Sequence, residues 1–176
     1  MKKLVVIING RGGVGKDTLC DFAGKYFKVK NVSAITPIKD IARQNGWNEE
    51  KDAKSRKFLA DIKKAFIEYN DLPFKYLGRE YNKFLNGQED IMFVHIREGE
   101  EIDKFKLIVE VPCVTLLVLR KQNGNNHWGN ASDDNVGKYH YDYEYNNDKS
   151  LQEAEVDFAA FLKRVFQKET GSQERE

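Results

Sequence analysis

Nine consecutive residues near the start of the chain combine four glycines with one lysine, a pattern suited to binding a phosphate. Glycine lets the backbone curl tightly, so that several N–H groups point at one anion. Lysine adds a flexible point charge that reaches the outer phosphates of a nucleotide. The segment consists of Gly10, Arg11, Gly12, Gly13, Val14, Gly15, Lys16, Asp17 and Thr18.

The neighbouring segments agree with the G-x-x-x-x-G-K spacing of a P-loop. Residues 4–8 form a continuous apolar run, which is typical of a central parallel strand covered on both faces. Residues 16–27 place apolar side chains on one helical face, and a helix that begins near Lys16 directs the positive end of its dipole at the loop. A plain glycine-rich turn would leave Lys16 unexplained, so the sequence predicts a nucleotide phosphate site.

The residue after the P-loop lysine departs from the usual Ser or Thr, whose hydroxyl holds Mg²⁺. Asp17 instead offers a carboxylate that holds Mg²⁺ directly or through water. Its alternative role is to stabilise the first turn of the helix. We favour the metal role and expect Thr18 to contact the nucleotide phosphates through its hydroxyl and backbone N–H. The expected cofactors are therefore ATP and Mg²⁺.

Strands and helices alternate along the rest of the chain, which predicts an α/β fold of three layers around a five-stranded, mostly parallel sheet. The expected strands cover residues 4–8, 32–35, 91–96, 113–119 and 141–145. The expected helices cover residues 16–27, 36–46, 48–69, 72–85, 98–105 and 151–166. We expect a single domain over residues 1–167 and a disordered tail over residues 168–176. Residues 120–139 lack clear periodicity, and loops of that length inside a compact domain are usually lids or binding loops, or else disordered.

The composition argues against several other classes of protein. A formal net charge of +1 lacks the basic excess of a nucleic-acid-binding protein. No apolar run approaches the ~20 residues that span a membrane. Cys20 and Cys113 lie among apolar neighbours, which indicates buried free thiols and a reducing cytoplasm. The expected partner is a small-molecule phosphate acceptor, and the oligomeric state is left open.

Four short segments carry a resemblance to a known family. They are residues 15–23 around the P-loop lysine, residues 36–40 (Thr-Pro-Ile-Lys-Asp), residues 93–97 followed by Glu101, and residues 133–147. Their order resembles that in the deoxynucleoside monophosphate kinases of phages and the animal-type phosphomevalonate kinases, which share a P-loop kinase fold. One position departs from the family pattern, because His95 stands where an aspartate is usual.

The resemblance implies ATP-dependent phosphoryl transfer to a small phosphorylated acceptor, with a nucleoside or deoxynucleoside monophosphate favoured over phosphomevalonate. It implies a helical acceptor-binding region over residues 36–88 and a lid over residues 120–140. An acceptor phosphate oxygen is already a competent nucleophile, so the transfer needs no dedicated base.

Cations that follow the strands are the candidates for the acceptor site, because ligands of open α/β sheets bind beyond the carboxyl ends of the strands. The candidates for acceptor binding are Lys39, Arg43, Arg56, Arg79 and Arg97, with Arg97 preferred for its bidentate fork. The candidate catalytic residues are Lys16, Arg97 and Arg120, and Lys121 joins Arg120 as a lid cation that would stabilise the transferring phosphoryl group. Each of these cations has an alternative role as a surface ion-pair partner or as a solvated strand end.

Two other classes of function stay open. The loop is also similar to the G-K-G-G-V-G-K-T loop of partitioning-type ATPases, in which Arg11 would replace the signature lysine. The later strands lack the acidic switch motifs of those ATPases, and the chain lacks the N-K-x-D motif of regulatory GTPases. A non-catalytic nucleotide-binding protein would suit the departure at His95 and the few cations in the lid.

Overall fold

The computed structural model describes residues 2–121 and 135–171 and contains a parallel five-stranded sheet. Its strands are β1 (Leu4–Asn9), β2 (Val29–Ser33), β3 (Ile91–His95), β4 (Cys113–Leu119) and β5 (Tyr143–Asn146). They lie in the order β2-β3-β1-β4-β5, and every neighbouring pair is parallel. The P-loop therefore follows the central strand, as the sequence predicted.

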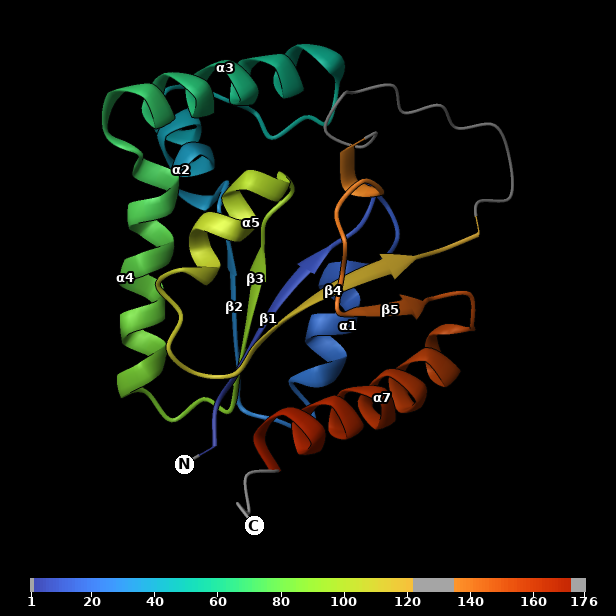
Figure 1. Cartoon of the computed structure of the whole chain (residues 1–176). Helices are drawn as coiled ribbons and strands as arrows, with labels where there is room; N and C mark the ends of the chain where they lie inside the picture. Colours follow the sequence, from blue (N-terminus) through green and yellow to red (C-terminus); the bar gives the residue numbers. More distant parts are fainter. Residues whose placement is uncertain (1, 122–134, 172–176) are drawn as a thin grey trace.

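Helices cover both faces of the sheet and its carboxyl end. They are α1 (Lys16–Ala23), α2 (Thr36–Gln44), α3 (Ala53–Asn70), α4 (Leu72–Asn86), α5 (Gly99–Lys106) and α7 (Leu151–Gly171). Alternate residues of β1 pack against α1 and α7 on one face and against α4 and α5 on the other. Figure 1 shows α3 lying across the end toward which the strand arrows point. The expected three-layer architecture is confirmed.

Several element boundaries differ from those expected from the sequence. α1 ends at Ala23 rather than near residue 27, because after Gly24 the helical bonds are replaced by turn bonds: Lys25 N donates to the Phe22 carbonyl, three residues back. β2 covers Val29–Ser33, a few residues earlier than expected. α3 begins at Ala53 rather than near residue 48, because the Asp52 side chain caps it by accepting a 2.7 Å hydrogen bond from Ser55 N.

The closing helix is longer than expected. α7 continues past residue 166 to Gly171, so residues 168–171 belong to the helix and not to a disordered tail. Residues 172–176 lie outside the described part of the chain.

α3 differs from the other helices in its burial. Some of its apolar side chains are only partly covered, with Phe58 40% exposed and Ile67 39% exposed. Ser55 is the buried residue of this helix. α3 therefore covers the carboxyl end of the sheet instead of filling the core, and it leaves apolar side chains accessible there.

Candidate active site

The P-loop connects β1 to α1 through glycines that the backbone conformation requires. Gly10 and Gly15 have φ angles of 152° and 90°, which L side chains rarely adopt. A Cβ atom at Gly10 would lie 2.6 Å from the Val118 carbonyl oxygen, and one at Gly15 would lie 2.6 Å from Asn147 Nδ2. A larger residue at Gly10 would push the loop away from β4, and one at Gly15 would displace the Asn147 side chain.

Lys16 begins α1 with its ammonium folded back over the P-loop. Its Nζ donates hydrogen bonds of 2.7 Å to the Gly10 carbonyl and 3.0 Å to the Arg11 carbonyl. The tip of the loop is open, because nothing lies within 4 Å of a Cβ atom built at Gly12 or Gly13. An ammonium ion, an accessible glycine loop and a helix N-terminus thus meet at the carboxyl end of β1, and these groups suit a polyphosphate.

Asn9 is a buried connector that the sequence pattern does not single out. Its Oδ1 accepts a 2.9 Å bond from Gly10 N, and its Nδ2 donates to the Arg97 carbonyl at 3.0 Å and to the Tyr141 hydroxyl at 2.8 Å. The Tyr141 hydroxyl donates in turn to the Val136 carbonyl at 2.9 Å. Asn9 therefore joins the start of the P-loop to the end of β3. The sequence signals Asn9 only by its position, as a polar residue between the apolar run and the first glycine.

Asn147 holds the P-loop from the other side and is likewise buried. Its Nδ2 donates a 2.8 Å bond to the Val14 carbonyl, and its backbone N–H donates a 2.7 Å bond to the Leu119 carbonyl. One residue after β5 thereby fixes the loop between β1 and α1 to the end of β4. In the sequence it appears only as the second residue of an Asn–Asn pair.

Asp17 lies in the first turn of α1, where its side chain is 91% exposed. Mg²⁺ in phosphate sites commonly takes one or two carboxylates together with phosphate oxygens and water. A single solvent-accessible carboxylate beside the P-loop lysine fits that requirement. Over residues 2–121 and 135–171, no group of three or more His, Cys, Asp or Glu side chains is placed to hold a metal ion.

His95 ends β3 behind the P-loop. Its Nε2 lies 2.8 Å from Asn31 Oδ1, 3.7 Å from the Cys20 sulfur and 3.9 Å from Asp17 Oδ1. Burial lowers the pKa of His95 to about 4; the Asp17 carboxylate opposes this shift and the Lys16 ammonium adds to it. The imidazole is therefore neutral at pH 7, and its contact with Asp17 is not an ion pair.

Three of the predicted acceptor cations come from elements that meet at the carboxyl end of the sheet. Arg97 follows β3 with an exposed side chain, Lys39 is half-buried on α2, and Arg56 is exposed on α3. Arg79 differs from these three. It is exposed halfway along α4, which runs beside the sheet rather than over its end (Figure 1).

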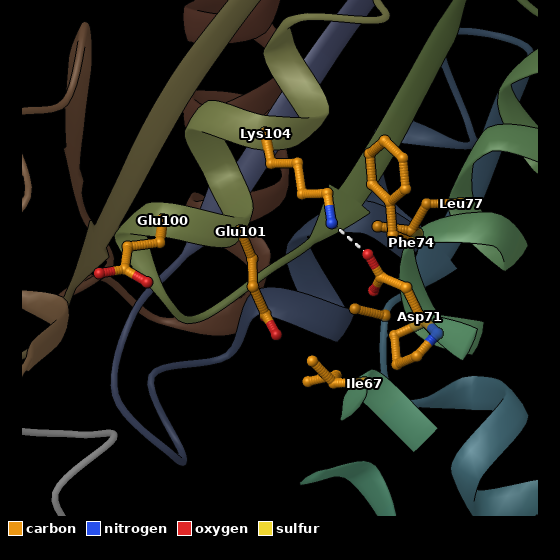
Figure 2. A pocket seen from close by; sticks show the side chains of 9 residues that line it. Ile67, Asp71, Phe74, Leu77, Glu100, Glu101 and Lys104 are labelled. Atoms are coloured by element: carbon orange, nitrogen blue, oxygen red, sulfur yellow. Dashed lines mark hydrogen bonds and ion pairs between the residues drawn. The ribbon is translucent and has the colours of Figure 1, made fainter. Parts of the chain in front are cut away.

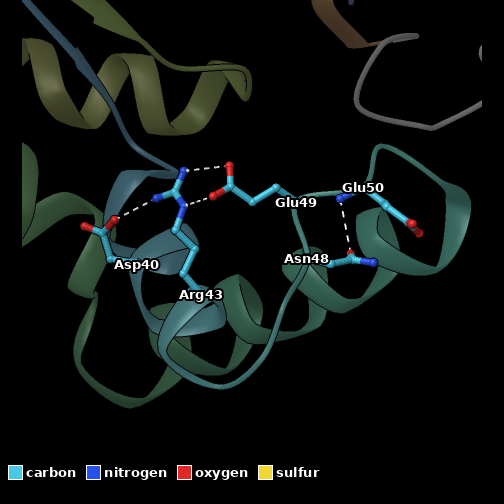
Figure 3. Close-up of polar contacts among 5 residues, drawn as sticks. All are labelled: Asp40, Arg43, Asn48, Glu49 and Glu50. Atoms are coloured by element: carbon cyan, nitrogen blue, oxygen red, sulfur yellow. Dashed lines mark hydrogen bonds and ion pairs between the residues drawn. The ribbon is translucent and has the colours of Figure 1, made fainter.

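Arg43 takes part in a surface ion-pair cluster. The sequence allowed this role as the alternative to acceptor binding. Its Nε donates to Glu49 Oε1 at 2.7 Å, and its Nη1 donates to Asp40 Oδ1 at 2.9 Å (Figure 3). The hydrogen bond that Arg43 donates to Glu49 raises the pKa of Arg43, and the same bond lowers the pKa of Glu49. An acceptor phosphate would have to displace two carboxylates to reach this guanidinium.

The expected lid is described only at its two ends. Arg120 and Lys121 are exposed beyond β4, and the backbone N–H of Lys121 donates a 2.6 Å bond to Asp148 Oδ1. Residues 122–134 lie outside the described part of the chain. The following segment is packed, because Val136 is buried and the Tyr139 hydroxyl donates a 2.6 Å bond to Asp103 Oδ1 on α5. Residues 136–140 are therefore packed against the body of the protein, and the expected lid over residues 120–140 stays a prediction.

The two cysteines are free thiols, and neither has the properties of a nucleophile. Burial raises the pKa of Cys20 and raises that of Cys113 to about 12, so neither thiol ionises near neutral pH. None of the described helices has the length and apolar character needed to cross a membrane.

Comparison with protein-family models and with curated proteins gives no match to this sequence. Solved structures do share its fold. A putative kinase from Chloroflexus aurantiacus has a TM-score of 0.56 and 11% identity, and the match covers 96% of this chain and 98% of that one. The protein TT1252 from Thermus thermophilus has a TM-score of 0.53 and 14% identity, over 94% and 99% of the two chains. A sugar kinase from Janibacter sp. has a TM-score of 0.52 and 12% identity, over 93% and 95%. At these identities the likeness shows the fold alone, an α/β fold that this chain shares with those proteins.

Proposed function

We propose that this protein transfers a phosphoryl group from ATP to a small phosphorylated acceptor, and that the acceptor is a nucleoside or deoxynucleoside monophosphate. The observation that carries the proposal is the Lys16 ammonium, held 2.7 Å and 3.0 Å from two P-loop carbonyls at the start of α1. The kinase names of several proteins with this fold support the same class of reaction.

The residues present suit each part of such a transfer. The loop N–H groups and Lys16 would bind the β- and γ-phosphates, and Asp17 would hold Mg²⁺, which neutralises charge on the phosphates. Arg97, Lys39 and Arg56 would bind the acceptor phosphate. One of its oxygens would attack the γ-phosphorus while the bond to the ADP oxygen breaks, and Arg120 would stabilise the charge on the transferring group. The two free thiols agree with a reducing cytoplasm as the place of action.

The first prediction tests the P-loop assignment. Replacing Lys16 with alanine removes the charge directed at the phosphates, so Lys16→Ala should lower ATP-dependent phosphoryl transfer by at least 100-fold. The measurement is a coupled assay of ADP release with a panel of ribo- and deoxyribonucleoside monophosphates and 5-phosphomevalonate. Lys163→Ala is the matched control, because Lys163 is exposed on α7. Near-normal turnover by Lys16→Ala would refute the assignment.

The same assay separates the remaining classes of function. Turnover with one acceptor supports the kinase. ATP binding in calorimetry without transfer to any acceptor would instead indicate a non-catalytic nucleotide-binding protein. Slow ATP hydrolysis coupled to dimerisation would indicate a partitioning-type ATPase.

A further inference from the structure

A cavity of about 180 Å³ lies between the end of α3, the start of α4 and α5. Ile67, Phe74 and Leu77 form its apolar wall, and Ala34 lies at its base directly after β2. Figure 2 shows these walls together with Glu100, Glu101 and Lys104, which project from α5. An engineered apolar cavity of about 150 Å³ binds benzene, so a space of this size admits a single six-membered ring.

The cavity lies at the same end of the sheet as the P-loop and two strands away from it. Ala34 N donates a 3.1 Å bond to the His95 carbonyl, which places the base of the cavity beside the end of β3. β3 pairs with β1 on its other side, and neighbouring strands are about 4.8 Å apart. Two such spacings separate Ala34 from the end of β1, where the P-loop starts, by roughly 10 Å along the sheet. Arg97 follows β3, the strand between them, so a phosphate bound by Arg97 would lie between the P-loop and the cavity.

The charges at the cavity are mainly negative. Asp71 pairs with Lys104, and Glu101 pairs with Lys63 at 2.8 Å. No cation in the described part of the chain pairs with Glu100. Three carboxylates thus face two ammonium groups, so a ligand group with a further negative charge would be repelled. Carboxylate oxygens accept hydrogen bonds, and they favour groups that carry amino donors.

We infer that this cavity receives the non-phosphate part of the acceptor, and that it selects an uncharged ring bearing an amino group over one that carries a carbonyl or a carboxylate in that place. The inference rests on the proposed function and names the substrate class of that same site: amino-bearing nucleoside monophosphates, with phosphomevalonate excluded. Phe74 supplies an aromatic wall for the ring, and Glu100 supplies the acceptor for the amino group.

A pair of matched ligands tests the selection. CMP and UMP share the ribose phosphate and the pyrimidine ring; CMP carries a 4-amino group and an unprotonated N3, and UMP carries a 4-oxo group and an N3–H. We expect CMP to bind at least tenfold more tightly than UMP in calorimetry with a non-hydrolysable ATP analogue present, and 5-phosphomevalonate to bind more weakly than either. Glu100→Gln should reduce the ratio between CMP and UMP to below threefold, because an amide both donates and accepts.

A second pair of variants tests the location. Ile67 lines the cavity and is 39% exposed, so Ile67→Trp should fill the space without disturbing the core. We expect this variant to weaken CMP binding at least tenfold and to leave ATP binding unchanged. Tyr69→Trp is the matched control, because Tyr69 is on the same helix, is 84% exposed and does not line the cavity.

The outcomes distinguish this inference from the proposed function. If UMP binds best, or if Ile67→Trp leaves CMP binding unchanged, the inference is wrong while the kinase proposal stands. If 5-phosphomevalonate binds best, both the inference and the nucleotide acceptor of the proposed function are wrong. If CMP binds as expected but no phosphate is transferred, the inference holds and the proposed function is wrong.

Discussion

Asn9 and His95 are uncharged side chains that support the P-loop from behind at the ends of two neighbouring strands. Asn9 uses both atoms of its amide, so the first N–H of the loop and the carbonyl of Arg97 have partners away from water. His95 lies against α1, and it is neutral at pH 7 because its burial lowers the pKa of the imidazole. A charged side chain at either position would require an oppositely charged partner. Lys16 or Asp17 would then form that ion pair and would no longer be available to a ligand.

The burial of His95 predicts a pH-dependent stability. The unfolded chain binds a proton at this residue near pH 6.5, and the folded chain binds it only near pH 4. Its contribution to the free energy of unfolding should therefore be constant above pH 6.5, decrease between pH 6.5 and 4 by up to about 3 kcal/mol, and be constant again below pH 4. Urea denaturation of the wild type and of His95→Gln at pH 7 and pH 4.5 measures this contribution.

The variant keeps a side chain that can bond to Asn31 but does not titrate, so its stability should decrease less over the same range. An NMR titration of the wild-type imidazole gives an independent check. A midpoint near pH 6.5 in the folded protein would contradict the predicted effect.

The loop between β5 and α7 is bonded to the P-loop through Asn147. Asn147→Ala removes the 2.8 Å bond to the Val14 carbonyl and leaves that buried acceptor unpaired. The free energy of unfolding should decrease by about 1–2 kcal/mol, and the KM for ATP should rise more than the KM for the acceptor. Denaturation and steady-state kinetics measure the two effects.

Asn146→Ala is the matched control, because Asn146 is the neighbouring residue and is exposed at the end of β5. Equal effects of the two substitutions would mean that the contact to Val14 does not support the loop.

Local patterns predicted the elements, and long-range contacts decided the details that the sequence missed. The strand β1 and the glycine loop after it are defined by residues that are neighbours in the chain, so the sequence alone predicted both. Asn147 and Val14 are 133 positions apart, and no local pattern connects them. Arg43 is similar, because its pairing with Glu49 depends on a turn in which Glu49 adopts a φ angle of 64°. Periodicity carries no information on such a turn.

At the scale of the whole molecule, α7 closes the face of the sheet that α1 also covers. Phe158 is fully buried there, with its ring centroid 5.0 Å from that of Tyr145 and 6.0 Å from that of Phe161. Phe158→Ala should lower the free energy of unfolding by about 3–5 kcal/mol, because it removes buried surface and leaves a cavity. Val156→Ala on the same helix is the control, and its 65% exposure predicts a change within about 0.5 kcal/mol.

Thermal and urea denaturation measure both variants. A loss at Phe158 no larger than that at Val156 would mean that α7 is not part of the cooperative core.

The parallel pairing of β1 has a consequence for how the protein is made. Leu4 pairs with Ile91, Val5 pairs with Cys113, and the P-loop is bonded by Asn147, so the earliest residues of the chain acquire their partners from much later ones. Such distant pairing slows folding, because long loops must close first. When the glycines and Lys16 emerge from the ribosome, the strands that hold them in the folded protein have not yet been made. The ability to bind a nucleotide should therefore arise late in synthesis, when nearly the whole chain has emerged.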